Sequence, residues 1–154
     1  MAVVGSTAPK AHEHTAPPGR YDAGTSFWQL TTRAAERWPD ACMAVDEADR
    51  SITFGEFATR AERLAAGLHD LGVRAGEVVS WMVPTWIETC LLIAALDRLG
   101  VVQNPMLPIY REREVGFITR QARTTRMITP STWRGYDYAA LAKGAVADVL
   151  VIDR

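Results

Sequence analysis

The residues best suited to chemistry gather in a hydroxyl-rich segment near the carboxyl end of the sequence. Residues 129–135 read Thr-Pro-Ser-Thr-Trp-Arg-Gly. Hydroxyl and glycine residues occur in phosphate-binding loops, where glycine lets several backbone N–H groups approach the oxygens. This segment has one glycine, and the sequence contains neither GxGxxG nor GxxxxGK followed by Ser or Thr. We therefore expect a connection from a strand to a helix, in which serine and threonine cap the turn.

One basic cluster precedes this segment. Its members are arginines at closely spaced positions: Arg111, Arg113, Arg120, Arg123 and Arg126. On a helix, Arg113 and Arg120 would share a face, with Arg123 near Arg120. One interpretation is a solvated face on which Glu112 and Glu114 pair with the arginines. The other is a contact with a phosphorylated ligand or with another part of a larger protein.

The cysteines and histidines do not form a reactive arrangement. Cys90 lies in an apolar helical pattern, where a thiol behaves as a small hydrophobic group, and we expect Cys42 and Cys90 to be free thiols. His69 falls at the end of a predicted helix, where it favours the helix dipole. His12 and His14 could share a metal on an extended chain, but no third ligand lies nearby. The residues thus predict no catalytic, cofactor-binding or metal-binding position.

Composition excludes several classes of protein. The chain has 154 residues, 48% hydrophobic and 23% charged, which is typical of one globular domain. A net charge of −1 argues against a nucleic-acid partner, because such proteins usually carry a basic excess. The longest uninterrupted apolar run, residues 90–96, is too short to span a bilayer. No signal peptide is recognisable and only two cysteines are present, so we expect a cytoplasmic protein without a transmembrane segment.

The elements that would position these residues follow an alternating pattern. Residues 1–25 are rich in proline and glycine and are expected to be a flexible tail, with order over residues 26–154. Capping boxes at Ser26 and Thr53 predict two helices, the second ending before Gly72. Later elements are predicted as strands at 78–83, 101–103, 126–129 and 149–152, a loop at 104–108, and helices at 86–99, 113–123 and 136–143.

This order predicts an α/β fold, a mostly parallel sheet with helices on both faces. The helix at 86–99 is apolar almost all round and should be covered on more than one side. Four aromatic residues fall on positions that we expect to be buried: Phe27, Trp38, Trp81 and Trp86.

Several short motifs, taken together over residues 26–154, resemble a known family. In chain order they are Trp38-Pro39-Asp40, Ile52-Thr53-Phe54-Gly55-Glu56-Phe57, Leu64-Ala65-Ala66-Gly67-Leu68, Leu71-Gly72-Val73, Gly76-Glu77-Val78-Val79, Gly100-Val101-Val102 and Asn104-Pro105. Their order and spacing resemble the start of the AMP-forming acyl-CoA synthetases, within the adenylate-forming, AMP-dependent synthetase and ligase superfamily. Residues 108–114 and 133–138 are similar to the fatty-acid or cyclohexanecarboxylate-CoA ligase branch.

The resemblance implies a ligase that acts in two steps. A fatty or other carboxylic acid would react with ATP, with magnesium, to give an acyl-adenylate, and coenzyme A would then displace AMP. The family's phosphate loop, magnesium-binding acid and catalytic lysine correspond to positions after Arg154, so no site residue is carried over. Two positions also depart from relatives: Pro84 is followed by Thr85 rather than Asn, and Met106 replaces a basic residue that contacts coenzyme A in some relatives.

The resemblance therefore predicts a fragment of an acyl-CoA ligase, truncated before the phosphate loop and inactive alone. The alternative is a non-catalytic α/β module that binds a partner, or a gene remnant. We also expect an exposed apolar face and an open strand edge, both of which favour self-association.

Overall fold

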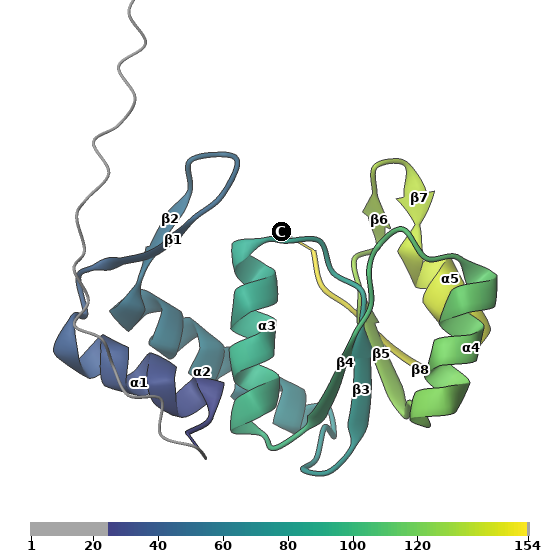
Figure 1. The fold of residues 1–154 in the computed structure, drawn as a ribbon, viewed down its shortest axis with the longest axis horizontal. Coiled ribbons are helices and arrows are strands. Elements are labelled where there is room, and N and C mark those ends of the chain that lie inside the picture. The colour runs from purple at the N-terminus through teal and green to yellow at the C-terminus, as the bar shows by residue number, and fades with distance from the viewer. Residues whose placement is uncertain (1–24, 154) are drawn as a thin grey trace, which may run out of the picture.

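A four-stranded parallel sheet organises the computed structural model, which describes residues 25–153 (Figure 1). The strands lie in the order β4 (Val102–Pro105), β3 (Val78–Trp81), β5 (Arg126–Thr129) and β8 (Asp148–Val151), and every neighbouring pair is parallel. The α/β prediction is thus confirmed. The expected tail falls almost entirely on residues 1–24, outside the described part of the chain.

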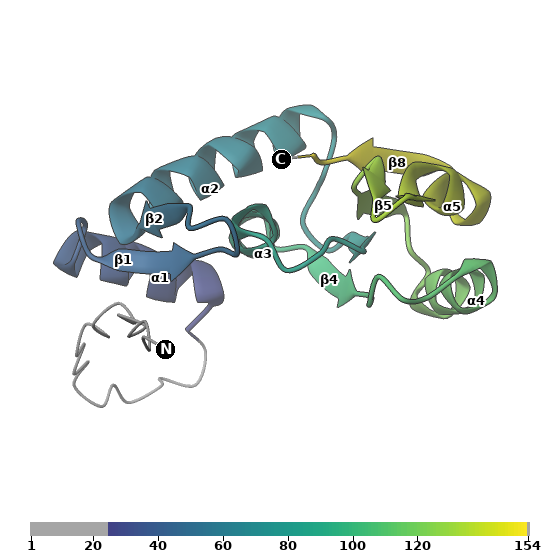
Figure 2. The same ribbon diagram turned by 90° about the horizontal axis from the view of Figure 1, so that it is seen from above.

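Helices cover both faces of this sheet. α2 (Phe54–Asp70) and α3 (Ile87–Arg98) lie on one side, and α4 (Glu112–Ala122) and α5 (Tyr138–Ala145) lie on the other (Figures 1 and 2). The chain moves from β3 to β4 in one direction, then back across β3 to β5 and on to β8. Crossover connections between parallel strands are almost always right-handed. Two right-handed connections that run in opposite directions along a sheet must lie on its opposite faces, which explains why the helices are divided between the two faces.

The first two helices begin where the sequence predicts. In α1 (Phe27–Arg37) the Ser26 hydroxyl accepts the Gln29 N–H at 3.2 Å, and the Gln29 side chain accepts the Ser26 N–H at 3.0 Å. Thr53 and Glu56 form the same reciprocal pair at the start of α2. Such caps each stabilise a helix by about 1 kcal/mol. The first turn of α1 also makes a tertiary contact: the Trp28 N–H donates a hydrogen bond to Asp97 Oδ2 of α3 at 2.8 Å.

Helix α3 is buried from two sides, as its composition predicts. Leu92, Ala95 and Leu96 pack toward the sheet in one apolar cluster with Val79 and Ile128. A second cluster, the α2–α3 cluster, consists of Ile52, Phe57, Ala61, Ile87, Leu91 and Ala94. The helix therefore joins the sheet to an N-terminal layer that also contains α1 and the antiparallel pair β1 (Cys42–Val45) and β2 (Ser51–Thr53).

Three features differ from expectation. β4 extends through Asn104 and Pro105, which were expected in a loop; a proline is tolerated there because β4 is an edge strand. The segment before α5 contains an antiparallel hairpin of β6 (Thr132–Trp133) and β7 (Tyr136–Asp137). Two aromatic side chains predicted to be buried are partly exposed, Phe27 by 39% and Trp38 by 42%, because α1 lies on the outside of the N-terminal layer.

Within residues 25–153, no helix combines the length and apolar character needed to cross a membrane.

Candidate functional site

The topology singles out one edge of the sheet. In open parallel sheets, ligands bind beyond the carboxyl ends of the strands, where the direction of the connections reverses. Here that point lies between β3 and β5, because the chain leaves β3 toward β4 and leaves β5 toward β8. The segments that follow these strands begin at Met82 and Pro130, and the Met82 N–H donates to the Ile128 carbonyl at 2.9 Å.

This edge is tightly hydrogen-bonded rather than open. The Ser131 N–H donates to Asp153 Oδ1 at 2.9 Å, the Ile152 N–H donates to the Thr129 carbonyl at 2.9 Å, and the Ser131 carbonyl accepts the Tyr138 N–H at 3.1 Å. The Thr129 side chain is fully buried, and its hydroxyl has no hydrogen-bond partner in the structure. The N–H of Ser131, the first hydroxyl residue after β5, is therefore already satisfied.

The hydroxyl-rich segment at 129–135 is not a phosphate loop. Arg134 and Gly135 both have positive φ, 50° and 77°, which is the turn geometry of a two-residue hairpin. The expected serine and threonine caps are wrong: Asp137 caps α5, and its Oδ1 accepts the Ala140 N–H at 2.8 Å. The prediction that this segment connects a strand to a helix is confirmed, with the hairpin inserted between them.

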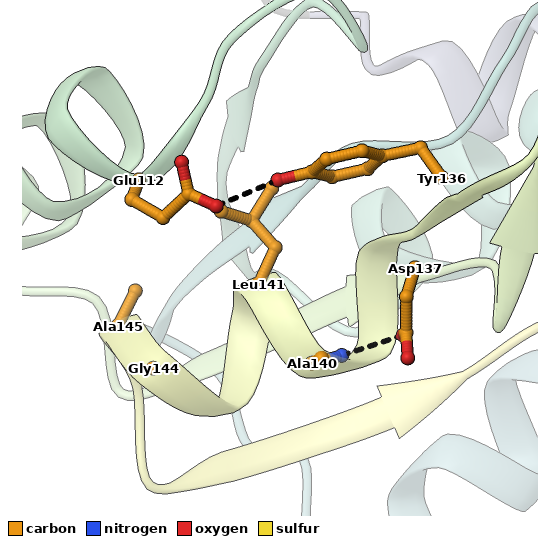
Figure 3. Close-up of a pocket in the computed structure, with 7 residues that line it drawn as sticks. All are labelled: Glu112, Tyr136, Asp137, Ala140, Leu141, Gly144 and Ala145. Carbon is orange, nitrogen blue, oxygen red and sulfur yellow. Dashed lines mark hydrogen bonds between the residues drawn. The ribbon is translucent and has the colours of Figure 1, made fainter.

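A shallow pocket of about 360 Å³ lies between α4 and α5 (Figure 3). The Tyr136 hydroxyl donates to Glu112 Oε1 at 2.8 Å above a floor of Ala140, Leu141 and Gly144. A backbone hydrogen bond and the Tyr136 hydroxyl lower the pKa of Glu112, and the bond to Glu112 raises the pKa of Tyr136. Both shifts move the pKa away from neutral pH, so at neutral pH the carboxylate is charged and the phenol neutral.

A second hollow, the α2–β8 groove, has a volume of about 460 Å³ and is almost entirely apolar. It runs between α2 and β8, which is the edge strand of the sheet formed by residues 25–153. The lining residues are Leu64, Gly67, Leu68, Asp70, Leu71, Leu92, Ile128, Leu150, Val151 and Ile152. A neighbouring hollow shares Leu64 and Ile152 and adds Arg60, Arg63 and Glu88. This surface can hold an apolar segment of chain, but it carries no reactive group.

An ion-pair network fastens the β1–β2 hairpin to the start of α3. Arg50 donates Nη1 and Nη2 to the two carboxylate oxygens of Glu88 at 3.0 and 3.1 Å, and its Nε contacts Asp46 Oδ2 at 2.6 Å. Partial burial raises the pKa of Glu88, but the hydrogen bonds and charge of Arg50 outweigh it, so the pKa lies below its usual range. The network is structural, because each charge is used by a neighbour.

The predicted arginine cluster separates into three parts. Arg111 stacks on the Tyr136 ring, with its guanidinium carbon 4.2 Å from the ring centre. Arg126 lies in β5 and pairs with Asp148 at 2.6 Å, away from the helix. Arg113, Arg120 and Arg123 are exposed and take part in no ion pair between described residues.

The expected exposed face is confirmed for Arg113, Arg120 and Arg123, but Glu112 and Glu114 form no salt bridge with the cluster among the described residues. Glu114 accepts the Arg111 backbone N–H at 3.2 Å, and Glu112 accepts the Tyr136 hydroxyl. Both carboxylates serve the start of α4, where negative charge favours the helix dipole.

The remaining candidates stay apart. Cys90 is half-buried in α3 and burial raises its pKa, whereas Cys42 is exposed, and both are free thiols. His69 Nδ1 lies 3.8 Å from Asp70 Oδ1 at the exposed end of α2. His12 and His14 lie outside the described residues. Among residues 25–153, His, Cys, Asp and Glu side chains form no group of three that could hold a metal.

Comparison with known proteins assigns the chain to a family. A family model described as "AMP-binding enzyme" matches residues 31–154, well over half of the chain. The chain belongs to the AMP-binding enzyme family. It is 31% identical over 132 residues to the salicyl-AMP ligase / salicyl-S-ArCP synthetase of Mycobacterium tuberculosis, a match covering 83% of this chain and 23% of that protein. It is 27% identical over 108 residues to the medium-chain fatty-acid–CoA ligase of Escherichia coli, covering 70% of this chain and 19% of that one.

Solved structures show the same fold. The N-terminal subdomain of Klebsiella oxytoca NpsA superposes with a TM-score of 0.73 at 24% identity, over 82% of this chain and 31% of that one. This AMP-binding enzyme chain spans less than a quarter of the length of the two curated relatives. These relatives include both an aryl-AMP ligase and a fatty-acid ligase, so the predicted fatty-acid branch is not confirmed.

At the carboxyl edge of the sheet, the N–H groups of Ser131, Ile152 and Met82 already donate hydrogen bonds. Met106, which departs from the pattern of the resembled family, is 4% exposed and packs with Met82 and Met127.

Proposed function

We propose that this chain supplies the N-terminal α/β layer of a ligase that activates a carboxylic acid with ATP, forming an acyl-adenylate, and passes the acyl group to a thiol such as that of coenzyme A. The match of the AMP-binding enzyme model to residues 31–154 carries this proposal. The names of its relatives support both aromatic and fatty acids as the substrate class. We further propose a cytoplasmic location.

We propose also that the 154 residues do not catalyse the reaction alone. The sequence contains no glycine-rich phosphate motif, and the segment closest to one forms the β6–β7 hairpin. The carboxyl edge of the sheet would then be a wall of a site whose reactive groups come from elsewhere. In this arrangement the chain contributes shape and support rather than acids, bases or metal ligands.

The isolated chain provides the first test. ATP–pyrophosphate exchange is measured with salicylate, benzoate, octanoate and decanoate, with heated protein and no protein as controls. We expect no exchange above the control. Heat-sensitive exchange with any of the acids would show that the chain holds a complete site and would overturn the second proposal.

A chimera tests the first proposal. The segment of the Mycobacterium tuberculosis salicyl-AMP ligase that matches this chain is replaced by the corresponding residues of this chain. Salicylate-dependent exchange is expected to persist, and to disappear when the same chimera carries Leu92→Asp, because Leu92 is fully buried between α3 and the sheet. A soluble, folded chimera without exchange would contradict the assignment.

A second candidate function is a non-catalytic module that binds a partner. The α2–β8 groove favours it, because an apolar hollow beside an unpaired strand edge suits an added strand or helix. The occupant that we propose is a second copy of the chain, which would cover Leu71 and Val151, exposed by 61% and 49%.

A further inference from the structure

One side of α2 faces the α2–β8 groove. The buried residues of this helix are Phe57, Ala61, Ala65 and Leu68. At 100° per residue, six other positions fall within about 120° of one another, next to the buried side. They line the groove or the hollow beside it, and they are Arg60, Arg63, Leu64, Gly67, Asp70 and Leu71. We call these six residues the α2 seam; in Figure 2 its carboxyl end lies beside β8.

The α2 seam has the spacing of a stripe that pairs with another helix. Arg60, Leu64, Gly67 and Leu71 follow one another by four, three and four residues, like the core positions of a two-helix coiled coil. A Cβ on Gly67 would meet nothing within 4 Å. Glycine disfavours a helix interior relative to alanine, but it lets another backbone approach closely. The seam can therefore receive a second helix across Gly67.

Two opposite charges lie along one flank of the seam. Arg63 and Asp70 are seven residues apart, and so they differ by only about 20° around the helix. Arg63 is exposed and takes part in none of the ion pairs between described residues. His69 Nδ1 lies 3.8 Å from Asp70 Oδ1, but the Asp70 side chain is 86% exposed and can accept a second partner. Arg60, the other charged member, lies 3.9 Å from Glu88.

We propose that two copies of this chain pair through the α2 seam, with their α2 helices antiparallel about Gly67. Residues at similar distances on either side of the centre then meet. Arg63, four residues before Gly67, lies opposite Asp70 of the second copy, three residues after it, and Leu64 meets Leu71 in the same way. A parallel pair would instead bring like charges together. An antiparallel pair of identical helices has twofold symmetry, so each contact occurs twice and the assembly closes as a dimer.

This inference rests on the second candidate function, self-association through the α2–β8 groove, and adds the arrangement of the two copies. The groove volume of about 460 Å³ beside Leu150 and Ile152 leaves room for side chains of the second helix. The seam extends over about three helical turns, a smaller contact than the standard interface of about 1,600 Å². We therefore expect a dimer that forms at micromolar concentration.

Charge reversal tests the arrangement. Sedimentation equilibrium of the full chain at low salt measures the dimer dissociation constant. Arg63→Asp would place two aspartates against each other at both ends of the seam, and Asp70→Arg would place two arginines there. Each variant alone should dimerise at least about tenfold more weakly than the wild type. In an equimolar mixture the two variants oppose each other with opposite charges, so dimers should reappear with about the wild-type affinity and weaken with salt.

The matched control is Arg33→Asp on α1. Arg33 is an exposed arginine outside every ion pair of residues 25–153, and its reversal changes the net charge as Arg63→Asp does. The control should dimerise within about twofold of the wild type. Dimers in the mixture would also show that both seam variants are folded.

Three results would overturn the inference. Wild-type dimerisation of both seam variants, with loss of dimers in Val151→Lys, would exclude the antiparallel pairing and keep the groove as the site of self-association. Seam variants that stay monomeric when mixed would show that the substitutions do not act across an interface between copies. A wild type that remains monomeric up to millimolar concentration would exclude both the pairing and the second candidate function, and would leave the groove to a different chain.

Discussion

Replacing Thr129 by valine should make the protein more stable. Thr129 is fully buried at the carboxyl end of β5, and its hydroxyl oxygen has no hydrogen-bond partner in the structure. A buried polar group without a partner costs about 1–3 kcal/mol. Valine has nearly the same shape and removes that cost, so we expect a gain of about 1 kcal/mol. For a chain of this length the gain corresponds to a rise in Tm of about 2–4 °C.

Ser80→Ala is the opposing control. Ser80 is equally buried, but its hydroxyl lies 2.6 Å from Thr124 Oγ1 and accepts the Asn104 amide at 2.8 Å. Alanine leaves both partners without their bond, and we expect a loss of about 1–3 kcal/mol. Thr129→Ser keeps the hydroxyl and removes a methyl group, and it should cost about 1 kcal/mol.

Urea unfolding followed by tryptophan fluorescence measures all three variants. The slope of free energy against urea should stay constant, so that a shift of the midpoint reports stability. Lower stability of Thr129→Val than of the wild type would mean that the hydroxyl makes a favourable contact in solution. Equal losses of unfolding free energy in Thr129→Val and Ser80→Ala would contradict the prediction. They would show that the presence or absence of hydrogen-bond partners does not decide the effect of removing these two hydroxyl groups.

The remaining predictions concern acid, thiol chemistry and association. The pKa of Glu88 is lowered in the folded state, so the charged carboxylate stabilises the fold above its ordinary pKa of 4.5. This stabilisation is lost as the pH falls below 4.5 and Glu88 becomes protonated. Urea unfolding at several pH values should therefore show a weaker loss of stability in acid for Glu88→Gln than for the wild type. Thiol titration should modify Cys42 before Cys90, because burial raises the pKa of Cys90; faster modification of Cys90 would contradict this. Light scattering should show dimers at micromolar concentration, reduced by Val151→Lys on β8, whereas a monomer at all concentrations would exclude the groove as a self-association site.

Much of the fold follows from local signals in the sequence. The capping boxes at Ser26 and Thr53 set the starts of α1 and α2. Gly72, with φ of 90°, follows the end of α2 where the sequence places it. These signals are local because a cap or a left-handed turn depends on residues within one helical turn.

Features that depend on distant neighbours were harder to predict. The β6–β7 hairpin is local, but its turn places Arg134, a non-glycine residue, at positive φ, and residue type alone does not predict that conformation. Trp38 satisfies helical periodicity yet remains exposed, because burial depends on what packs against α1. The α2–β8 groove joins residues 64–71 to 150–152 and is set by the distance between a helix and an edge strand. Periodicity within one segment contains no information about that distance.

The α2–α3 cluster has a consequence for synthesis on the ribosome. Its six buried residues, from Ile52 to Ala94, are all made before β4 begins at Val102. Domains and their parts can fold as the chain emerges, at about 5–20 residues per second. The N-terminal layer can therefore close around Phe57 while β5 and β8 are still being translated, and it presents α3 as a finished surface. The sheet would then assemble strand by strand against a helix that is already held in place.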